Sequence, residues 1–119
     1  MPTPVETAVQ TYIRAAGERD PVARAQLLEA CFAEDGRMVT RSSVIRGRAG
    51  VDALIARFHA DPQAPRFRLT SAIDAVGATF RYHSIVENRD GSTVDFFDAG
   101  EIDGGGKIVT LLVFAGPLS

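Results

Sequence analysis

Apolar residues follow two different periods along the chain, and the change between them divides it into two parts. Up to about residue 60, three segments carry apolar residues three and four positions apart, the spacing of helices buried on one side. From Arg66 onward, apolar residues fall at every second position instead, as in half-buried strands. The pattern therefore predicts three N-terminal helices followed by a mainly antiparallel sheet, an α+β arrangement in a single domain over residues 1–119.

Local signals mark where each predicted helix begins and ends. Helix starts are indicated by a capping box or by an N-cap residue followed by proline, and helix boundaries by a glycine or proline just outside the periodic segment. The signals are the capping box Thr3-Pro4-Val5-Glu6 with Gly17 as the end, the pair Asp20-Pro21 before a helix through Phe32, and Gly47 and Gly50 before a helix closed by Pro62 and Pro65.

The remaining segments are assigned to turns and strands. We predict a turn over residues 33–36 and a short strand over residues 37–41. Four long strands then form a meander, with turns at residues 89–92 and 103–107. The predicted strands span residues 66–76, 78–88, 93–103 and 107–116.

The last two predicted strands are apolar on both faces. Strict alternation places Ile108, Leu112 and Phe114 on one side and Val109, Leu111 and Val113 on the other. The helices can cover only one face of the sheet, so the other face needs a second cover. We therefore predict a homodimer that forms through the sheet.

Composition narrows the class of protein. The chain has 119 residues, of which 45% are hydrophobic, and a formal net charge of −2, so no global charge attracts nucleic acid or an anionic membrane. Its single cysteine cannot form an internal disulfide. Its first residues lack the pattern of a signal peptide, and no apolar run approaches the roughly 18 residues of a membrane helix. We expect a cytoplasmic protein without nucleic-acid or membrane partners.

Several motifs that carry chemistry elsewhere do not qualify here. The stretch DGGGK at residues 103–107 continues as a strand, so it is a hairpin turn and not a phosphate loop. His59 and His83 lack the spacing of metal ligands, Cys31 lies on an apolar helix stripe, and Ser42-Ser43 has no nucleophile elbow around it. We predict neither a metal nor a cofactor.

Four arginines lie close together in the sequence of this acidic chain. They are Arg37, Arg41, Arg46 and Arg48. A solvated loop is the simpler interpretation, and a cationic rim for an anionic ligand is the functional one.

Asp98 stands out because it lies in a strand among apolar residues. Alternation puts it on the same face as Phe96 and Ile102. A buried carboxyl without a counter-charge becomes neutral, and a neutral acid can donate a hydrogen bond to a developing oxyanion, as a buried tyrosine can. The alternative is a carboxylate at the sheet rim, bonded to a backbone amide or to an arginine such as Arg68 or Arg81.

Four stretches resemble the nuclear transport factor 2-like superfamily, which includes ketosteroid isomerases and SnoaL-like polyketide cyclases. They are VQTYIRAAGERD, LLEACFAEDGRMV, IRGRAGVDALIARF and FFDAGEIDGGGKIVTLLVFAGPL, and together they extend over nearly the whole chain. The resemblance implies a cone-shaped α+β barrel, in which a curved, mainly antiparallel sheet wraps around a long helix and encloses a pocket.

Individual residues match the ketosteroid isomerase pattern in part. Tyr12 matches the oxyanion-hole tyrosine, and Asp98 matches the protonated oxyanion-hole aspartate. Thr40 stands where the family has its general-base aspartate, and a threonine hydroxyl is too weak a base to remove a proton next to a carbonyl. Phe32 and Ile55 replace the family's supporting tyrosines.

We therefore expect a protein that binds a small apolar ligand with a carbonyl group, such as a polyketide or steroid-like ring. Tyr12 and Asp98 would polarise that carbonyl. If the protein is an enzyme, we expect it to be isomerase- or cyclase-like. The residues expected to line the pocket are Phe58, Phe80, Tyr82, Phe96 and Val113, with Met38, Thr40 and Arg41 at the mouth. One alternative is a non-catalytic dimeric binding or accessory module, whose cone is filled by side chains such as Phe58, Phe80 and Phe96. Another is a hydratase or cyclase with a different base.

Overall fold

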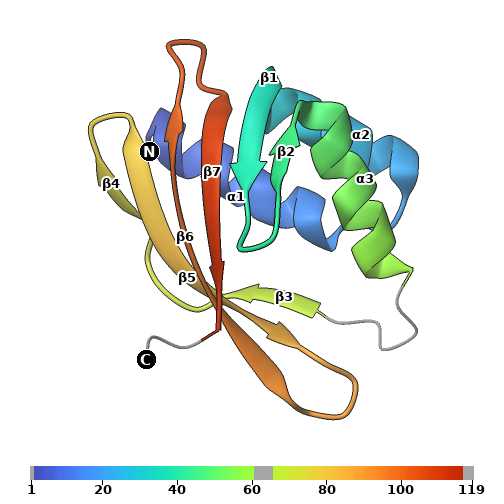
Figure 1. Cartoon of the computed structure of the whole chain (residues 1–119). Coiled ribbons are helices and arrows are strands. Elements are labelled where there is room, and N and C mark those ends of the chain that lie inside the picture. The colour runs from blue at the N-terminus through green and yellow to red at the C-terminus, as the bar shows by residue number, and fades with distance from the viewer. Residues whose placement is uncertain (1, 61–65, 117–119) are drawn as a thin grey trace.

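Three helices lie against one face of a curved sheet in the computed structural model, which describes residues 2–60 and 66–116 (Figure 1). The helices are α1 (Pro4–Gly17), α2 (Pro21–Cys31) and α3 (Arg48–His59). The strands are β1 (Phe32–Val39), β2 (Val44–Arg46), β3 (Arg66–Leu69), β4 (Asp74–Val76), β5 (Thr79–Glu87), β6 (Thr93–Ile102) and β7 (Ile108–Ala115). The predicted α+β class is confirmed.

The sheet has the strand order β2-β1-β7-β6-β5-β3, and β4 pairs with the other end of β5. Neighbouring strands in the described ranges are antiparallel except for β1 and β7, which run parallel. The sheet is therefore mainly antiparallel, as predicted. Its curvature creates a concave face, and α1 runs along that face (Figure 1).

The helix starts predicted from local signals are confirmed. Thr3 accepts a hydrogen bond from the Glu6 amide at 3.1 Å and completes the capping box of α1. Asp20 accepts from the Ala23 amide at 2.8 Å and caps α2. Gly47, with φ of 84°, precedes α3. The prolines predicted to close α3 lie outside the described residues.

The segment predicted as a turn over residues 33–36 is instead part of β1, and α2 ends one residue earlier than predicted, at Cys31. The strand β7 pairs in parallel with the residues on either side of this segment, Phe32 with Ile108 and Arg37 with Thr110, and the register shifts between these two pairs. Gly36 permits this packing, because a Cβ atom there would lie 2.7 Å from Phe32 Cε1. Tertiary pairing thus overrides a local turn signal.

The strand predicted over residues 66–76 is two strands, β3 and β4, separated at residues 70–73. In the break, one side-chain bond and one backbone bond to His83 of β5 replace the regular ladder. Ser71 Oγ accepts from the His83 amide at 2.8 Å, and the Thr70 amide donates to the His83 carbonyl at 3.0 Å.

The predicted face of Ile108 is wrong. The β6–β7 register pairs Ile102 with Ile108 and Glu101 with Thr110, so Val109 is an extra residue in a β-bulge. This extra residue turns Ile108 inward to join Leu111 in the core, and both side chains are fully buried.

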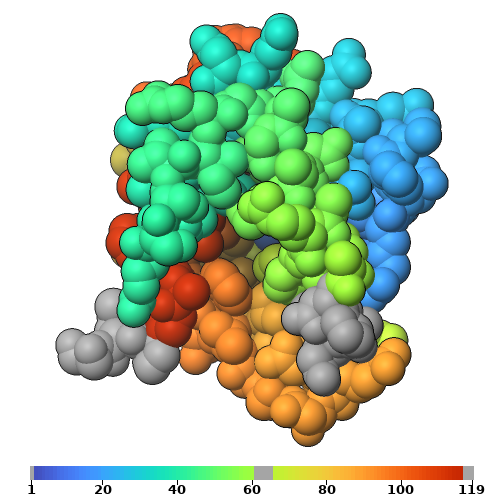
Figure 2. Space-filling view, turned by 45° about the vertical axis from the view of Figure 1, so that its right-hand side comes forward, coloured from blue at the N-terminus to red at the C-terminus, as the bar shows by residue number. Residues whose placement is uncertain are grey.

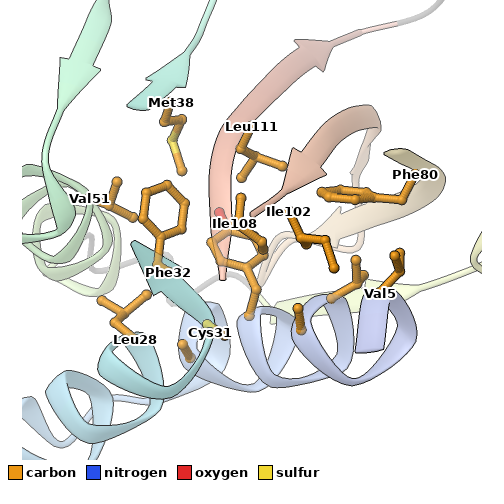
Figure 3. Close-up of a cluster of buried hydrophobic side chains, with 14 of the residues drawn as sticks. Val5, Leu28, Cys31, Phe32, Met38, Val51, Phe80, Ile102, Ile108 and Leu111 are labelled. Carbon is orange, nitrogen blue, oxygen red and sulfur yellow. The ribbon is translucent and has the colours of Figure 1, made fainter. Parts of the chain in front are cut away.

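The hydrophobic core occupies one end of the space between the sheet and the helices. Figure 3 shows Phe32 surrounded by side chains from α2, α3 and β7, with Phe80 and Ile102 packed near the start of α1. The buried residues of the first half of α1 are Val5, Ala8 and Val9. The second half of α1, from Tyr12, borders the open end of the cone, where the candidate site lies.

Candidate functional site

A cavity of about 440 Å³ lies between the second half of α1, the helix α3 and the concave face of the sheet. Figure 2 shows a hollow at this place, between α3 in green and the last two strands in red and orange. Its apolar walls include Ile13, Leu54, Phe58, Phe67, Phe96 and Val113. Its volume is typical of a site for one small molecule.

Asp98 lines this cavity from β6 and is only 7% exposed. Alternation along β6 points it inward together with Phe96, and the β5–β6 register places Tyr82 directly opposite. Tyr82 Oη donates a hydrogen bond to Asp98 Oδ2 at 2.7 Å. The other carboxyl oxygen, Oδ1, is buried and has no hydrogen-bond partner among the described residues.

Burial controls the ionisation of this carboxyl. Desolvation raises the pKa of Asp98 to about 6, and the hydrogen bond from Tyr82 works in the opposite direction because it stabilises the charged form. The pKa lies above the ordinary value of an aspartate and within the range where protonation changes near neutral pH.

No arginine compensates the Asp98 charge within the described residues. Arg68 pairs with Glu87 at 2.8 Å, and Arg81 pairs with Asp74 at 2.7 Å. In their strands, Arg68 and Arg81 each stand next to residues that point inward. Because successive side chains of a strand point to opposite faces, both arginines lie on the outer face of the sheet. The alternative of a carboxylate at the rim paired with an arginine is therefore wrong.

Tyr12 reaches the same cavity from α1 and is nearly buried. Burial, and secondarily the negative charge of Asp98, raises the pKa of the Tyr12 phenol far above its ordinary value. The hydroxyl is therefore neutral at any physiological pH and is available as a hydrogen-bond donor.

Thr40 and Arg41 lie at the mouth, in the turn between β1 and β2. Thr40 Oγ1 accepts from the Ser43 amide at 3.2 Å and lies 3.1 Å from Ser43 Oγ, so its side chain bonds within its own turn. Arg41 Nη2 donates to the Ala115 carbonyl at 3.0 Å and joins this turn to the end of β7.

The four clustered arginines do not form one surface. Arg37 and Arg46 are cross-strand partners of β1 and β2, and Arg48 Nη1 donates to the Phe32 carbonyl at 3.1 Å. Of the four, Arg41 alone borders the cavity in the part of the chain that the structure describes, where Arg57 from the last turn of α3 joins it.

Two residues expected in the lining lie elsewhere. Phe80 is in the core, where its ring lies against Gly100, and Tyr82 stacks on it with ring centroids 6.1 Å apart. The remaining expected residues do border the cavity: Tyr12, Met38, Thr40, Arg41, Phe58, Phe96, Asp98 and Val113.

The sequence did not reveal the role of Tyr82 as the partner of Asp98, nor the place of Arg57 and Phe67 at the cavity. Alternation along the strand indicated that Tyr82 points inward, but only the strand register shows which residue it faces. Phe67 stacks on Phe58 with centroids 4.8 Å apart, a contact between β3 and α3 that no local pattern indicates.

Other chemistry is not supported in the ranges 2–60 and 66–116. They contain no group of three or more histidine, cysteine or acidic side chains placed to hold a metal ion. Cys31 is fully buried, and burial raises the pKa of its thiol to about 12, so it is a packing residue and not a nucleophile. No helix in these ranges is long and apolar enough to cross a membrane.

Comparison with known proteins gives a consistent result at the level of the fold. No protein-family model matches the chain, and no curated protein matches it in sequence. Among solved structures, a candidate isomerase of the SnoaL-like family from Agrobacterium tumefaciens is 26% identical with a TM-score of 0.87, over 98% of this chain and 100% of the other.

Two further structures are more distant in sequence. A protein with a ketosteroid isomerase-like fold from Catenulispora acidiphila, solved in complex with trimethylamine, is 17% identical with a TM-score of 0.74, over 92% of this chain and 85% of the other. A nuclear transport factor 2-like protein from Cytophaga hutchinsonii is 13% identical with a TM-score of 0.73, over 98% and 93% of the two chains. The chain therefore has the fold of the nuclear transport factor 2-like superfamily, as its sequence motifs predicted.

Proposed function

We propose that the cavity binds a small, largely apolar carbonyl compound and polarises its carbonyl oxygen through Tyr12 and Asp98. The observation that carries this proposal is the buried Oδ1 of Asp98, which has no partner among the described residues and belongs to a carboxyl that lines an apolar cavity. A buried polar atom of this kind costs free energy unless a ligand satisfies it.

The chemistry follows from the ionisation of the two groups. Tyr12 is a neutral donor throughout, and Asp98 becomes a donor when it is protonated, below its pKa of about 6. An apolar ligand would displace water from the cavity and favour the neutral form further. Two neutral donors in a dry site can stabilise negative charge on a carbonyl oxygen, which is the basis of an oxyanion hole.

The missing base limits how far this site resembles a ketosteroid isomerase. By its resemblance to that family, the sequence has Thr40 in place of the base aspartate, and the Thr40 hydroxyl bonds to Ser43. Asp98 is the one carboxylate that borders the cavity within the described residues. We therefore place ligand binding first, with isomerase- or cyclase-like proton transfer through water or another group as its catalytic extension.

A non-catalytic binding or accessory module is the second candidate, and the Thr40 substitution favours it. The version in which aromatic side chains fill the cone is not supported, because Phe58 and Phe96 line an open cavity and do not close it. The complex of the Catenulispora protein with trimethylamine supports a small-molecule ligand in either case.

A pair of fluorescent probes tests the proposal. The ketone 6-propionyl-2-dimethylaminonaphthalene and its carbonyl-free analogue 2-dimethylaminonaphthalene differ only in the group to be recognised. At pH 5 about 90% of Asp98 is neutral and at pH 8 about 1%, so we expect the ketone to bind about tenfold more tightly at pH 5. The analogue should bind equally at both pH values.

Two variants serve as controls for this titration. Asp98→Leu removes one of the two donors and should reduce the preference for the ketone at pH 5 to its value at pH 8 or below, whereas Asp98→Asn keeps a neutral donor and should abolish only the pH dependence. Equal binding of the ketone and its analogue by the wild-type protein at pH 5 would contradict the proposal.

We further propose that a second copy of the chain covers the outer face of the sheet. Phe97 and Phe114 are cross-strand partners on that face and are 38% and 57% exposed. The described helices all lie on the other side (Figure 1). Sedimentation at micromolar protein should show a dimer that Phe114→Glu dissociates, and a concentration-independent monomer mass of the wild-type protein would refute it.

A further inference from the structure

The contact between Tyr82 and Asp98 determines which carboxyl oxygen remains available to a ligand. The two side chains are cross-strand partners on the concave face, both are buried, and Tyr82 Oη lies 2.7 Å from Asp98 Oδ2. Asp98 lines the cavity, whereas Tyr82 does not. Tyr82 therefore acts on this site only through Asp98.

The direction of this hydrogen bond follows from counting protons. Burial, reinforced by the neighbouring Asp98 charge, raises the pKa of Tyr82 well above its ordinary value, so its hydroxyl carries one proton at any physiological pH. Among the residues that the structure describes, that proton has one acceptor, Asp98 Oδ2. A neutral carboxyl also carries one proton, and with Oδ2 acting as an acceptor that proton belongs on Oδ1.

Packing holds the Tyr82 ring in place. It stacks on Phe80 with an interplanar angle of 14°, and the Phe80 ring fills the space above Gly100, where a Cβ atom would lie 2.6 Å from Phe80 Cζ. A donor whose ring is fixed by packing loses little entropy in holding the carboxyl, and this is how supporting residues preorganise a site.

We propose that Tyr82 is a positioning residue: it holds the Asp98 carboxyl through Oδ2 and thereby reserves Oδ1, with its proton, for the carbonyl oxygen of the ligand. This role rests on the proposed function of the cavity. It explains which oxygen of the Asp98 carboxyl faces the ligand. Tyr82 fixes the direction of donation, and Tyr12 supplies the second donor from α1.

The polar groups around Asp98 come from several elements. Tyr82 approaches from β5 and Tyr12 from α1, while Arg41 and Arg57 border the same cavity from the β1–β2 turn and α3. The two arginines make no ion pair with Asp98 among the described residues. The direct contact to be tested is therefore that with Tyr82.

The experiment compares Tyr82→Phe with Tyr12→Phe, since these are the two tyrosines of the chain and each variant loses one hydroxyl. Carbon-detected NMR, assigned with Asp98→Asn, measures the pKa of the Asp98 carboxyl. Tyr82→Phe should raise it by about one unit or more, because the ionised form loses its donor. Tyr12→Phe should leave it nearly unchanged.

Binding of the two naphthalene probes at pH 5 then separates positioning from ionisation. Asp98 is mostly neutral at this pH in both the wild-type protein and Tyr82→Phe, so a change in its charge cannot explain a difference. We expect Tyr82→Phe to weaken binding of the ketone about three- to tenfold, through the freed rotation of the carboxyl, and to leave the carbonyl-free analogue unaffected.

The failures of the two proposals are distinguishable. A preference for the ketone that survives unchanged in Tyr82→Phe would overturn the role of Tyr82 alone, whereas a wild-type protein without this preference would overturn the proposed function. If Tyr82→Phe does not fold, 3-fluorotyrosine labelling of the wild-type chain replaces it. The ¹⁹F signal of Tyr82 should follow the titration of Asp98, and a signal that does not would overturn the contact.

Discussion

The raised pKa of Asp98 predicts that this carboxyl makes the protein less stable as the pH rises. The pKa is about 6 in the folded chain and 3.8 without the protein environment, so the folded state binds the proton more tightly. Between these two values the native state carries more protons than the unfolded state, and the free energy of unfolding falls with increasing pH. The loss is complete above about pH 7.

The size of the effect follows from the same two values. They differ by about 2.2 units, and at 1.36 kcal/mol per unit this corresponds to about 3 kcal/mol. Such an amount is a large fraction of the 5–15 kcal/mol that typically stabilises a domain. The site therefore holds a carboxyl whose ionisation opposes folding, which is typical of a residue retained for function.

Asp98→Asn isolates this contribution, because the amide cannot ionise and the other carboxyl groups are common to both proteins. Urea denaturation at half-unit steps from pH 4 to pH 8 gives the free energy of unfolding of each. We expect the stability of Asp98→Asn relative to the wild-type protein to increase by about 2.4 kcal/mol between pH 4 and pH 7, because part of the 3 kcal/mol is already lost at pH 4. A difference that stays constant over this range would refute the burial argument.

Three other substitutions test separate parts of the structure. Gly100→Ala should destabilise the protein by about 1–3 kcal/mol in urea denaturation, because the new methyl group would overlap the Phe80 ring and a backbone carbonyl oxygen of β7; an unchanged midpoint would contradict this packing. Arg41→Ala should weaken binding of the anionic dye 8-anilinonaphthalene-1-sulfonate about threefold and leave the neutral ketone unaffected, whereas Arg46→Ala, outside the cavity lining, should change neither. Thr40→Asp places a carboxylate at the mouth of the cavity and should accelerate deuterium exchange next to the carbonyl of the bound ketone roughly 100-fold, as followed by proton NMR. An unchanged exchange rate would show that the position is not aligned with the ligand.

Much of the fold was predictable because its determinants are local. The Thr3 and Asp20 caps act on backbone amides three residues away, so the sequence alone indicates where α1 and α2 begin. Alternation along β5 and β6 likewise indicates that Tyr82, Phe96 and Asp98 point to one face of the sheet, because successive side chains of a strand point to opposite faces.

The predictions from sequence were wrong where a strand distant in the chain determines the backbone conformation of a segment. Residues 33–36 carry a turn signal, yet they lie within a strand because β7 pairs in parallel with Phe32 and Arg37 on either side of them. The bulge at Val109 shifts Ile108 to the inner face, and no local pattern indicates that an extra residue will be accommodated there.

The candidate site shows the same division. The sequence by itself indicated the nuclear transport factor 2-like fold and the inward direction of Asp98, because these depend on residue identity and on alternation along one strand. Only the tertiary structure decided that Tyr82 holds Asp98 Oδ2, that Phe80 lies in the core and that an open cavity remains beside Oδ1. The physical reason is that strand register, packing and desolvation arise between segments far apart in the chain, and these determine both the partner and the pKa of a buried carboxyl.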